Sequence, residues 1–165
     1  MASTIRILSN DPEETQEVGR VIGERAQAGD IYLLTGPLGS GKTCLTQGIA
    51  LGLGVTGYVR SPTFVIMSQY QGRLALYHVD LYRIGGPLEG WDLGLDEQLF
   101  GDGVCVVEWA DRAAELFPEE ALWIALDHGK GETQRTVSFG KGPERYFSVI
   151  EQLTASFPVT REVNP

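Results

Sequence analysis

Apolar and polar positions repeat with two different periods along the chain, and these periods divide it into short strands and amphipathic helices. Short apolar or alternating runs predict strands at residues 5–7, 30–35, 64–70, 74–82, 103–108, 122–126 and 133–139. The sequence Gln71-Gly72-Arg73 separates two of these runs and predicts a β-hairpin. Strands that alternate with helical segments indicate an α/β domain with a mixed sheet.

Apolar residues spaced three or four positions apart predict helices between the strands. The first begins where Asp11 can cap it, has Pro12 in its first turn, and continues to Gly29. Further helices are predicted at residues 43–53, 110–117 and 143–157, with a short one near residues 96–100 in an otherwise irregular segment, 85–103. The last long helix is expected to have one apolar face, formed by Tyr146, Phe147, Ile150 and Leu153.

The composition is that of an ordinary globular domain. The chain has 165 residues, of which 42% are hydrophobic and 21% charged, and this balance argues against disorder. We expect one domain at residues 1–158 and a frayed tail at residues 159–165. No apolar run approaches the ~20 residues of a membrane span, so we expect a cytoplasmic protein with no membrane partner.

Charge and cysteine content narrow the function further. The formal net charge of −9 disfavours unaided binding to a nucleic-acid backbone, so a role with nucleic acid would require a partner protein. Cys44 and Cys105 both lie in apolar sequence and are too few for a disulfide framework or a four-ligand zinc site. We therefore expect them to be small buried side chains.

Residues 36–43 read Gly-Pro-Leu-Gly-Ser-Gly-Lys-Thr and match the phosphate-binding loop, in which Gly and four residues precede Gly-Lys-Thr. Glycines let backbone N–H groups point at phosphate oxygens, Lys42 reaches the β and γ phosphates, and Thr43 offers its hydroxyl to Mg²⁺. An apolar strand precedes the loop and an amphipathic helix follows it, as the motif requires. The expected phosphate contacts are Gly36, Leu38, Gly39, Ser40, Gly41, Lys42, Thr43 and Cys44.

The motif predicts that the chain binds a nucleoside triphosphate, with ATP and Mg²⁺ as the favoured pair. It also predicts a three-layer α/β fold like that of P-loop NTPases, with a mixed, mainly parallel central sheet flanked by helices.

A site of this kind needs a distant carboxylate at the end of a neighbouring strand. Glu108 ends the apolar run at residues 103–108, and Asp80 ends the extended run at residues 76–80, where alternation places it on the same side as His78. Both are predicted to be catalytic and to bind the metal, with Glu108 also able to orient or deprotonate the attacking water. The alternative for each is a solvated strand end or a structural ion pair.

The sequence allows more than one interpretation for each of three other residues near these motifs. Thr63, in Ser61-Pro62-Thr63, could belong to a mobile loop that senses the γ-phosphate, or to a plain proline turn. Trp109 could cover the site, or could simply pack half-buried. His78 is expected to be structural or exposed, because phosphoryl transfer depends mainly on positioning and charge.

With these residues in place, the chain resembles the bacterial TsaE (YjeE) family, the ATPase subunit of the machinery that makes threonylcarbamoyladenosine (t6A) in tRNA. The resemblance covers nearly all of residues 5–140 and rests on five motifs in family order and spacing. They are GPLGSGKT at 36–43, SPTF at 61–64, HVDLYR at 78–83, LGLDEQL at 93–99 and VVEWADR at 106–112.

The resemblance implies a role for several residues. Lys42 and the loop glycines would hold phosphates, Thr43 and Glu108 would bind Mg²⁺, and Asp80 would lie near the metal and γ-phosphate. The residues that it places beside the nucleotide, the site or a subunit contact are Thr15, Trp109, Arg112 and Gly131. It also implies weak or partner-dependent ATP hydrolysis in a complex with TsaD and TsaB, and only indirect contact with tRNA.

Other functions remain open at this level. A small-molecule kinase would use the same loop, although Arg73, Arg83 and Arg112 are too scattered to form an arginine-bearing lid. A signalling GTPase would need an Asn-Lys-x-Asp sequence, which the chain lacks. A non-catalytic module that uses ATP to gate partner binding is the third alternative.

Overall fold

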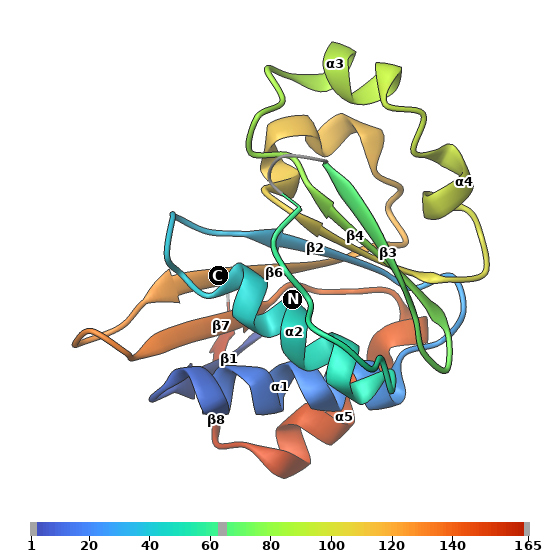
Figure 1. Cartoon of the computed structure of the whole chain (residues 1–165). Helices are drawn as coiled ribbons and strands as arrows, with labels where there is room; N and C mark the ends of the chain where they lie inside the picture. The colour runs from blue at the N-terminus through green and yellow to red at the C-terminus, as the bar shows by residue number, and fades with distance from the viewer. Residues whose placement is uncertain (1–2, 63–65, 164–165) are drawn as a thin grey trace.

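The computed structural model describes residues 3–62 and 66–163, and one eight-stranded sheet runs through them (Figure 1). Its strand order is β3-β4-β5-β2-β6-β7-β1-β8. The strands are β1 (Ser3–Ser9), β2 (Ile31–Thr35), β3 (Met67–Gln71), β4 (Ala75–Asp80), β5 (Val104–Glu108), β6 (Leu122–His128), β7 (Arg135–Phe139) and β8 (Val159–Val163). Strands were therefore found at each of the seven predicted places, and β3 and β4 form the predicted hairpin.

Only the centre of the sheet is parallel. β2 pairs in parallel with β5 and β6, and β4 pairs in parallel with β5. The other four pairings between described strands are antiparallel, so the prediction of a mixed sheet is confirmed and the prediction that it is mainly parallel is wrong. Short connections account for two of the four, because β3–β4 and β6–β7 are hairpins rather than helical crossovers. The other two arise where β1 pairs with the distant strands β7 and β8.

Helices cover both faces of the sheet and confirm the predicted α/β architecture (Figure 1). α1 (Pro12–Arg25), α2 (Lys42–Gly52) and α5 (Phe147–Ser156) pack on one face. α3 (Pro87–Asp92), α4 (Asp96–Leu99) and the 3₁₀ helix η1 (Ala110–Leu116) lie on the other, and a second 3₁₀ turn, η2 (Glu144–Tyr146), leads into α5. Within residues 3–62 and 66–163, no helix has the length and apolar character needed to span a membrane.

Most helix boundaries follow the sequence signals. Asp11 caps α1 by accepting a hydrogen bond from the backbone N–H of Glu14, as its position before Pro12 predicted, although the helix ends at Arg25 rather than at Gly29. α3 was not predicted, since residues 85–103 were expected to be irregular outside α4. Phe147, predicted to share an apolar face with Tyr146 and Leu153, is 57% exposed, whereas those two side chains are buried.

Residues 159–163 form a strand, whereas a frayed tail was predicted for residues 159–165. β8 pairs antiparallel with β1, with Ile7 opposite Val159 and Ile5 opposite Arg161. β1 had a free edge on this side, and its backbone N–H and C=O groups provide partners for any extended segment that reaches them. A pairing of this kind needs no apolar pattern in the added strand, so the sequence carries little signal for it.

Glycines allow α1 and α2 to pack in direct backbone contact. A Cβ at Gly48 would lie 2.1 Å from the carbonyl oxygen of Gln16, and one at Gly23 would lie 2.1 Å from that of Ile49. Two further glycines have equally little room, namely Gly19 and Gly52. Because α2 begins at the glycine-rich loop, this close packing fixes the direction in which the helix presents its N-terminus.

We predict that Gly48→Ala lowers the free energy of unfolding by about 1–3 kcal/mol, because the added methyl group must push the two helices apart. Urea denaturation measures the change. The control is Leu51→Ala, which alters a 49%-exposed side chain on the same helix and should change stability by less than about 0.5 kcal/mol. Equal effects of the two substitutions would contradict this account of the packing.

Candidate functional site

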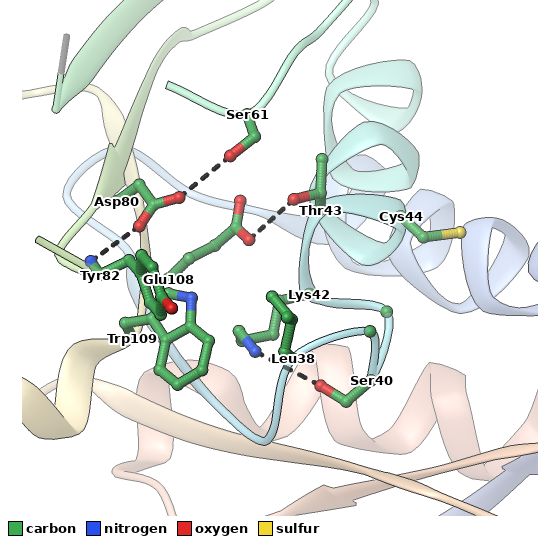
Figure 2. Close-up of a pocket in the computed structure, with 12 residues that line it drawn as sticks. Leu38, Ser40, Lys42, Thr43, Cys44, Ser61, Asp80, Tyr82, Glu108 and Trp109 are labelled. Atoms are coloured by element: carbon green, nitrogen blue, oxygen red, sulfur yellow. Dashed lines mark hydrogen bonds between the residues drawn. The ribbon is translucent and has the colours of Figure 1, made fainter. Parts of the chain in front are cut away.

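The candidate site lies where the parallel strands end. β2 ends at Thr35 and continues into the loop at residues 36–43 and then into α2. In the adjoining strands, Asp80 and Glu108 are direct register partners, and Leu34 of β2 pairs with Glu108. The register therefore places both predicted carboxylates beside the loop (Figure 2).

Three glycines give the loop its shape. Gly36, Gly39 and Gly41 have φ values of 142°, 77° and 102°, which side chains disfavour. A Cβ at Gly36 would also lie 2.2 Å from the carbonyl oxygen of Leu126. Gly41 is the N-cap of α2 and offers no side-chain cap, so the first N–H groups of the helix are available to an anion in the cavity.

Lys42 is folded back onto its own loop. Its ammonium donates to the carbonyl oxygens of Gly36 at 2.6 Å and Pro37 at 3.0 Å, and lies 3.9 Å from the ring centroid of Trp109. Burial lowers the pKa of Lys42 from its ordinary value of 10.5, an effect that the carboxylates of Glu108, Asp111 and Asp80 oppose. The ammonium is thus desolvated and held by neutral acceptors that a phosphate would outcompete.

Glu108 is 2% exposed and has a partner for each carboxylate oxygen. Thr43 of α2 donates from Oγ1 to Oε1 at 2.8 Å, and His78 of β4 is hydrogen-bonded through Nε2 to Oε2. Nδ1 of His78 is buried without a hydrogen-bond partner, so the contact with Glu108 is the polar contact that the imidazole makes within the described residues. His78 is therefore buried rather than exposed, and its partner is the central carboxylate of the site, while its structural role stays a prediction.

Asp80 is 4% exposed and is also held on both oxygens. The backbone N–H of Tyr82 donates to Oδ1 at 2.8 Å, and Ser61 donates from Oγ to Oδ2 at 3.0 Å (Figure 2). Ser61 belongs to the segment in which Thr63 was considered as a γ-phosphate sensor. Thr63 itself lies outside the described residues.

Trp109 has a left-handed backbone conformation, with φ of 57°, directly after β5. This turn brings its indole over Lys42 and against the ring of Tyr82, at a centroid distance of 4.9 Å. The guanidinium of Arg112 lies 5.5 Å from the Trp109 ring and 5.2 Å from that of Tyr82. Trp109 thus lines the site, and a strained backbone of this kind is common at functional positions.

These side chains enclose a cavity of about 330 Å³. Its lining consists of Leu38, Gly39, Ser40, Gly41, Lys42, Thr43, Cys44, Ser61, Asp80, Tyr82, Glu108 and Trp109. Ser61 and Tyr82 were not among the predicted site residues. A hydroxyl just before Pro62, and an aromatic residue two positions after Asp80, were the available signals for them.

A smaller cavity of about 180 Å³ lies on the other side of the loop and shares Gly39, Gly41 and Cys44 with the first. Thr15 lines this second cavity, where its buried hydroxyl is hydrogen-bonded to that of Ser9 at 2.6 Å. Gly131 lines neither cavity, although the next two residues line the smaller one. The predicted nucleotide contacts of Thr15 and Gly131 stay predictions.

The polar side chains of the cavity fit a magnesium ion that takes some of its ligands from the protein and the others from phosphates. Among residues 3–62 and 66–163, no group of three or more His, Cys, Asp or Glu side chains could hold a metal. Thr43 and Glu108, however, already have their oxygens 2.8 Å apart, with Asp80 beside Glu108 in register. Mg²⁺ at nucleotide sites usually takes only one or two protein oxygens and completes its shell with phosphates and water.

Comparison with known proteins agrees with this architecture. The crystal structure of YdiB from Bacillus subtilis superposes with a TM-score of 0.81 at 38% identity and covers 94% of this chain and 97% of its own. The TsaE of Bacillus subtilis is 43% identical over 87% of this chain and 90% of its own length. That of Treponema pallidum is 41% identical over 74% and 90%, respectively. Both carry the name tRNA threonylcarbamoyladenosine biosynthesis protein TsaE.

The family model that matches is the threonylcarbamoyl adenosine biosynthesis protein TsaE, over residues 9–137. The match spans every described residue of the cavity and confirms the resemblance found in the sequence motifs. The chain belongs to the TsaE family.

We predict that affinity for inorganic triphosphate falls as pH rises through the lowered pKa of Lys42, before the ordinary lysine value of 10.5 is reached. Phosphate binding needs the ammonium form, and burial makes that form lose its proton earlier than a free lysine would. Calorimetric titration across the alkaline range measures the effect. In Lys42→Arg, whose guanidinium stays charged, affinity should not decline over this pH range. If the variant lost affinity with pH as the wild type does, Lys42 would not be the group that titrates.

We also predict that nucleotide protects Cys44 from alkylation, because its side chain lines the cavity. At a Mg-ATP concentration of ~100 Kd, the rate of modification by a maleimide should fall about 100-fold. Mass spectrometry of the labelled peptide measures the rate. Cys105 is the internal control, because its full burial raises the pKa of its thiol to about 12 and it should react only on unfolding. Equal labelling of Cys44 with and without nucleotide would place the phosphates elsewhere.

Proposed function

We propose that the protein is a P-loop ATPase that binds Mg-ATP and hydrolyses it in support of t6A modification of tRNA. The observation that carries this proposal is the convergence of Lys42, Thr43, Asp80 and Glu108 on one cavity at the start of α2. Each has a role in phosphoryl chemistry, and they come from the loop and the ends of two adjacent strands. The names of the family and of its relatives, threonylcarbamoyladenosine biosynthesis proteins, support the biological role.

The phosphates are bound by the loop and the start of α2. The backbone N–H groups and the helix dipole favour negative charge at this position. Lys42 exchanges the carbonyl oxygens of Gly36 and Pro37 for phosphate oxygens, which form stronger charge-assisted hydrogen bonds with an ammonium. The indole of Trp109 excludes water from one side of the ammonium and strengthens its attraction to the phosphates.

Thr43 and Glu108 would hold Mg²⁺, with Asp80 close to it. The bound ion supplies positive charge to the β and γ phosphates. His78 fixes the rotamer of Glu108 from the side opposite Thr43, so the carboxylate keeps one orientation without nucleotide. Hydrogen bonds from the backbone N–H of Tyr82 and the hydroxyl of Ser61 orient the carboxylate of Asp80 in the same way. Either carboxylate can then position the attacking water, and Glu108 is the better candidate to accept its proton.

The acidic character of the chain agrees with a role in which other subunits contact RNA. With a formal net charge of −9, the protein lacks the excess of cations that RNA binding needs. We infer that it acts in the cytoplasm in a complex with TsaD and TsaB, that these subunits contact tRNA, and that ATP hydrolysis resets the complex between catalytic cycles.

We predict that ATP hydrolysis by the isolated chain is slow and that TsaD together with TsaB stimulates it. Lys42→Ala removes the phosphate ligand, and Glu108→Gln removes the proton acceptor while keeping the shape, so each should lower the stimulated rate by about 10²–10⁴-fold. Phosphate release measured with and without the partners tests this.

The two variants separate the alternatives. Glu108→Gln should still bind Mg-ATP and the partners, since its amide oxygen can replace the carboxylate oxygen that faces Thr43 and the metal, while Lys42→Ala should lose nucleotide affinity. No stimulation of the wild type by the partners would count against the biological role. A Glu108→Gln variant with the wild-type rate would assign hydrolysis to other groups, and transfer of phosphate to a small molecule would favour a kinase.

A further inference from the structure

The chain between Arg83 and Arg112 contains no lysine or arginine and has seven carboxylates. These are Glu89, Asp92, Asp96, Glu97, Asp102, Glu108 and Asp111. All except Glu108 are exposed. A large share of the net charge of −9 is therefore concentrated on α3, α4 and the turns around them.

The same segment exposes large apolar side chains. Leu88 and Trp91 are 82% and 58% exposed and lie three positions apart on α3, so they are neighbours on one face of the helix. Phe100, directly after α4, is 69% exposed. Single exposed apolar residues are common, but adjoining ones form an apolar patch, and tryptophan is among the side chains that contribute most to binding at protein interfaces.

Among the described residues, α3 packs on η1 through the side that carries Gly90. A Cβ at Gly90 would lie 2.4 Å from the side chain of Leu116 and 3.4 Å from that of Ala113, so the helix backbone rests closely on η1. Figure 1 shows α3 and α4 as the outermost elements on this face of the sheet, with nothing drawn beyond them. Leu88 and Trp91 therefore point away from the core that supports the helix.

This surface is connected to the cavity by a short stretch of chain. The segment leaves β4 at Asp80, passes Tyr82, whose side chain is 41% exposed and lines the cavity, and enters α3 at Pro87. The contact between the rings of Tyr82 and Trp109 links the beginning of this stretch to the indole that covers Lys42. A partner protein docked on α3 would thus bind a segment of chain whose first residues, Asp80 and Tyr82, line the phosphate site.

We propose that Leu88, Trp91 and Phe100, with the carboxylates around them, form a docking surface for a partner protein that presents an apolar pocket surrounded by lysine and arginine. A nucleic acid or an anionic membrane would be repelled by this density of carboxylates, whereas a protein with a basic surface is attracted to it. The proposal rests on the proposed function, because a subunit that binds tRNA must itself carry such a basic surface.

The test measures binding of the full chain to the purified TsaD–TsaB complex in the presence of Mg-ATP, by biolayer interferometry. Trp91→Ala and Leu88→Ala should each raise Kd at least about tenfold, as expected for buried interface anchors. Asp92→Lys should weaken binding and reduce its sensitivity to salt, because it reverses one of the attracting charges. Phe147→Ala, which removes a 57%-exposed aromatic side chain from α5 on the other face of the sheet, is the matched control and should leave Kd unchanged.

Calorimetry with Mg-ATP accompanies each variant, and an unchanged nucleotide affinity shows that the fold and the cavity are intact. Full partner binding by the Trp91→Ala and Leu88→Ala variants would overturn the docking surface while leaving the proposed function in place. Failure of the wild type to bind the complex would overturn both. If light scattering found a wild-type dimer that Trp91→Ala dissociates, with partner binding retained, the face would join two copies of this chain instead.

Discussion

The structure of the site depends on one buried carboxylate that three elements hold in place. Glu108 ends the central strand β5, receives a hydrogen bond from Thr43 at the start of α2, and is hydrogen-bonded to His78 of β4. A carboxylate that is 2% exposed is costly unless it is satisfied in this way. The same contacts join the loop to the strand ends, so the group that would bind the metal also aligns the helix that would bind the phosphates.

Other contacts in the fold hold the start of α2 in position relative to the ends of β4 and β5. Direct backbone packing between α1 and α2, through Gly23 and Gly48, restrains α2 against shifting along its axis. The parallel register of β4 and β5 fixes Asp80 beside Glu108. Lys42 is the group free to exchange partners, because its ammonium is held by loop carbonyls that phosphate oxygens can replace. The carboxylates of Asp80 and Glu108 are therefore already in position without nucleotide, whereas the ammonium of Lys42 can change its partners when phosphate binds.

Local signals made much of this predictable, and long-range pairing made the rest unpredictable. Asp11 and the glycine-rich loop mark helix starts by chemistry that acts within a few residues, so those elements and the convergence of Lys42 and Glu108 could be inferred from sequence. α3 was missed because Gly85, Gly86 and Gly90 lie just before it or within it and glycine lowers helix propensity, an effect that the packing of Gly90 on η1 offsets. Pro87 in its first turn was a start signal of the same kind as Pro12. β8 and the contact of Ser61 with Asp80 arise from pairing between distant segments, for which a single sequence offers no pattern.

The most direct test of the central claim is a calorimetric titration of ATP into the wild-type chain, with Mg²⁺ and again with the metal removed by a chelator. The arrangement of Lys42, Thr43 and Glu108 predicts saturable binding of one nucleotide per chain and a marked loss of affinity without Mg²⁺. No heat of binding with Mg-ATP, on material shown to be folded, would contradict the account. Equal affinity with and without the metal would contradict the assignment of Thr43 and Glu108 as its ligands.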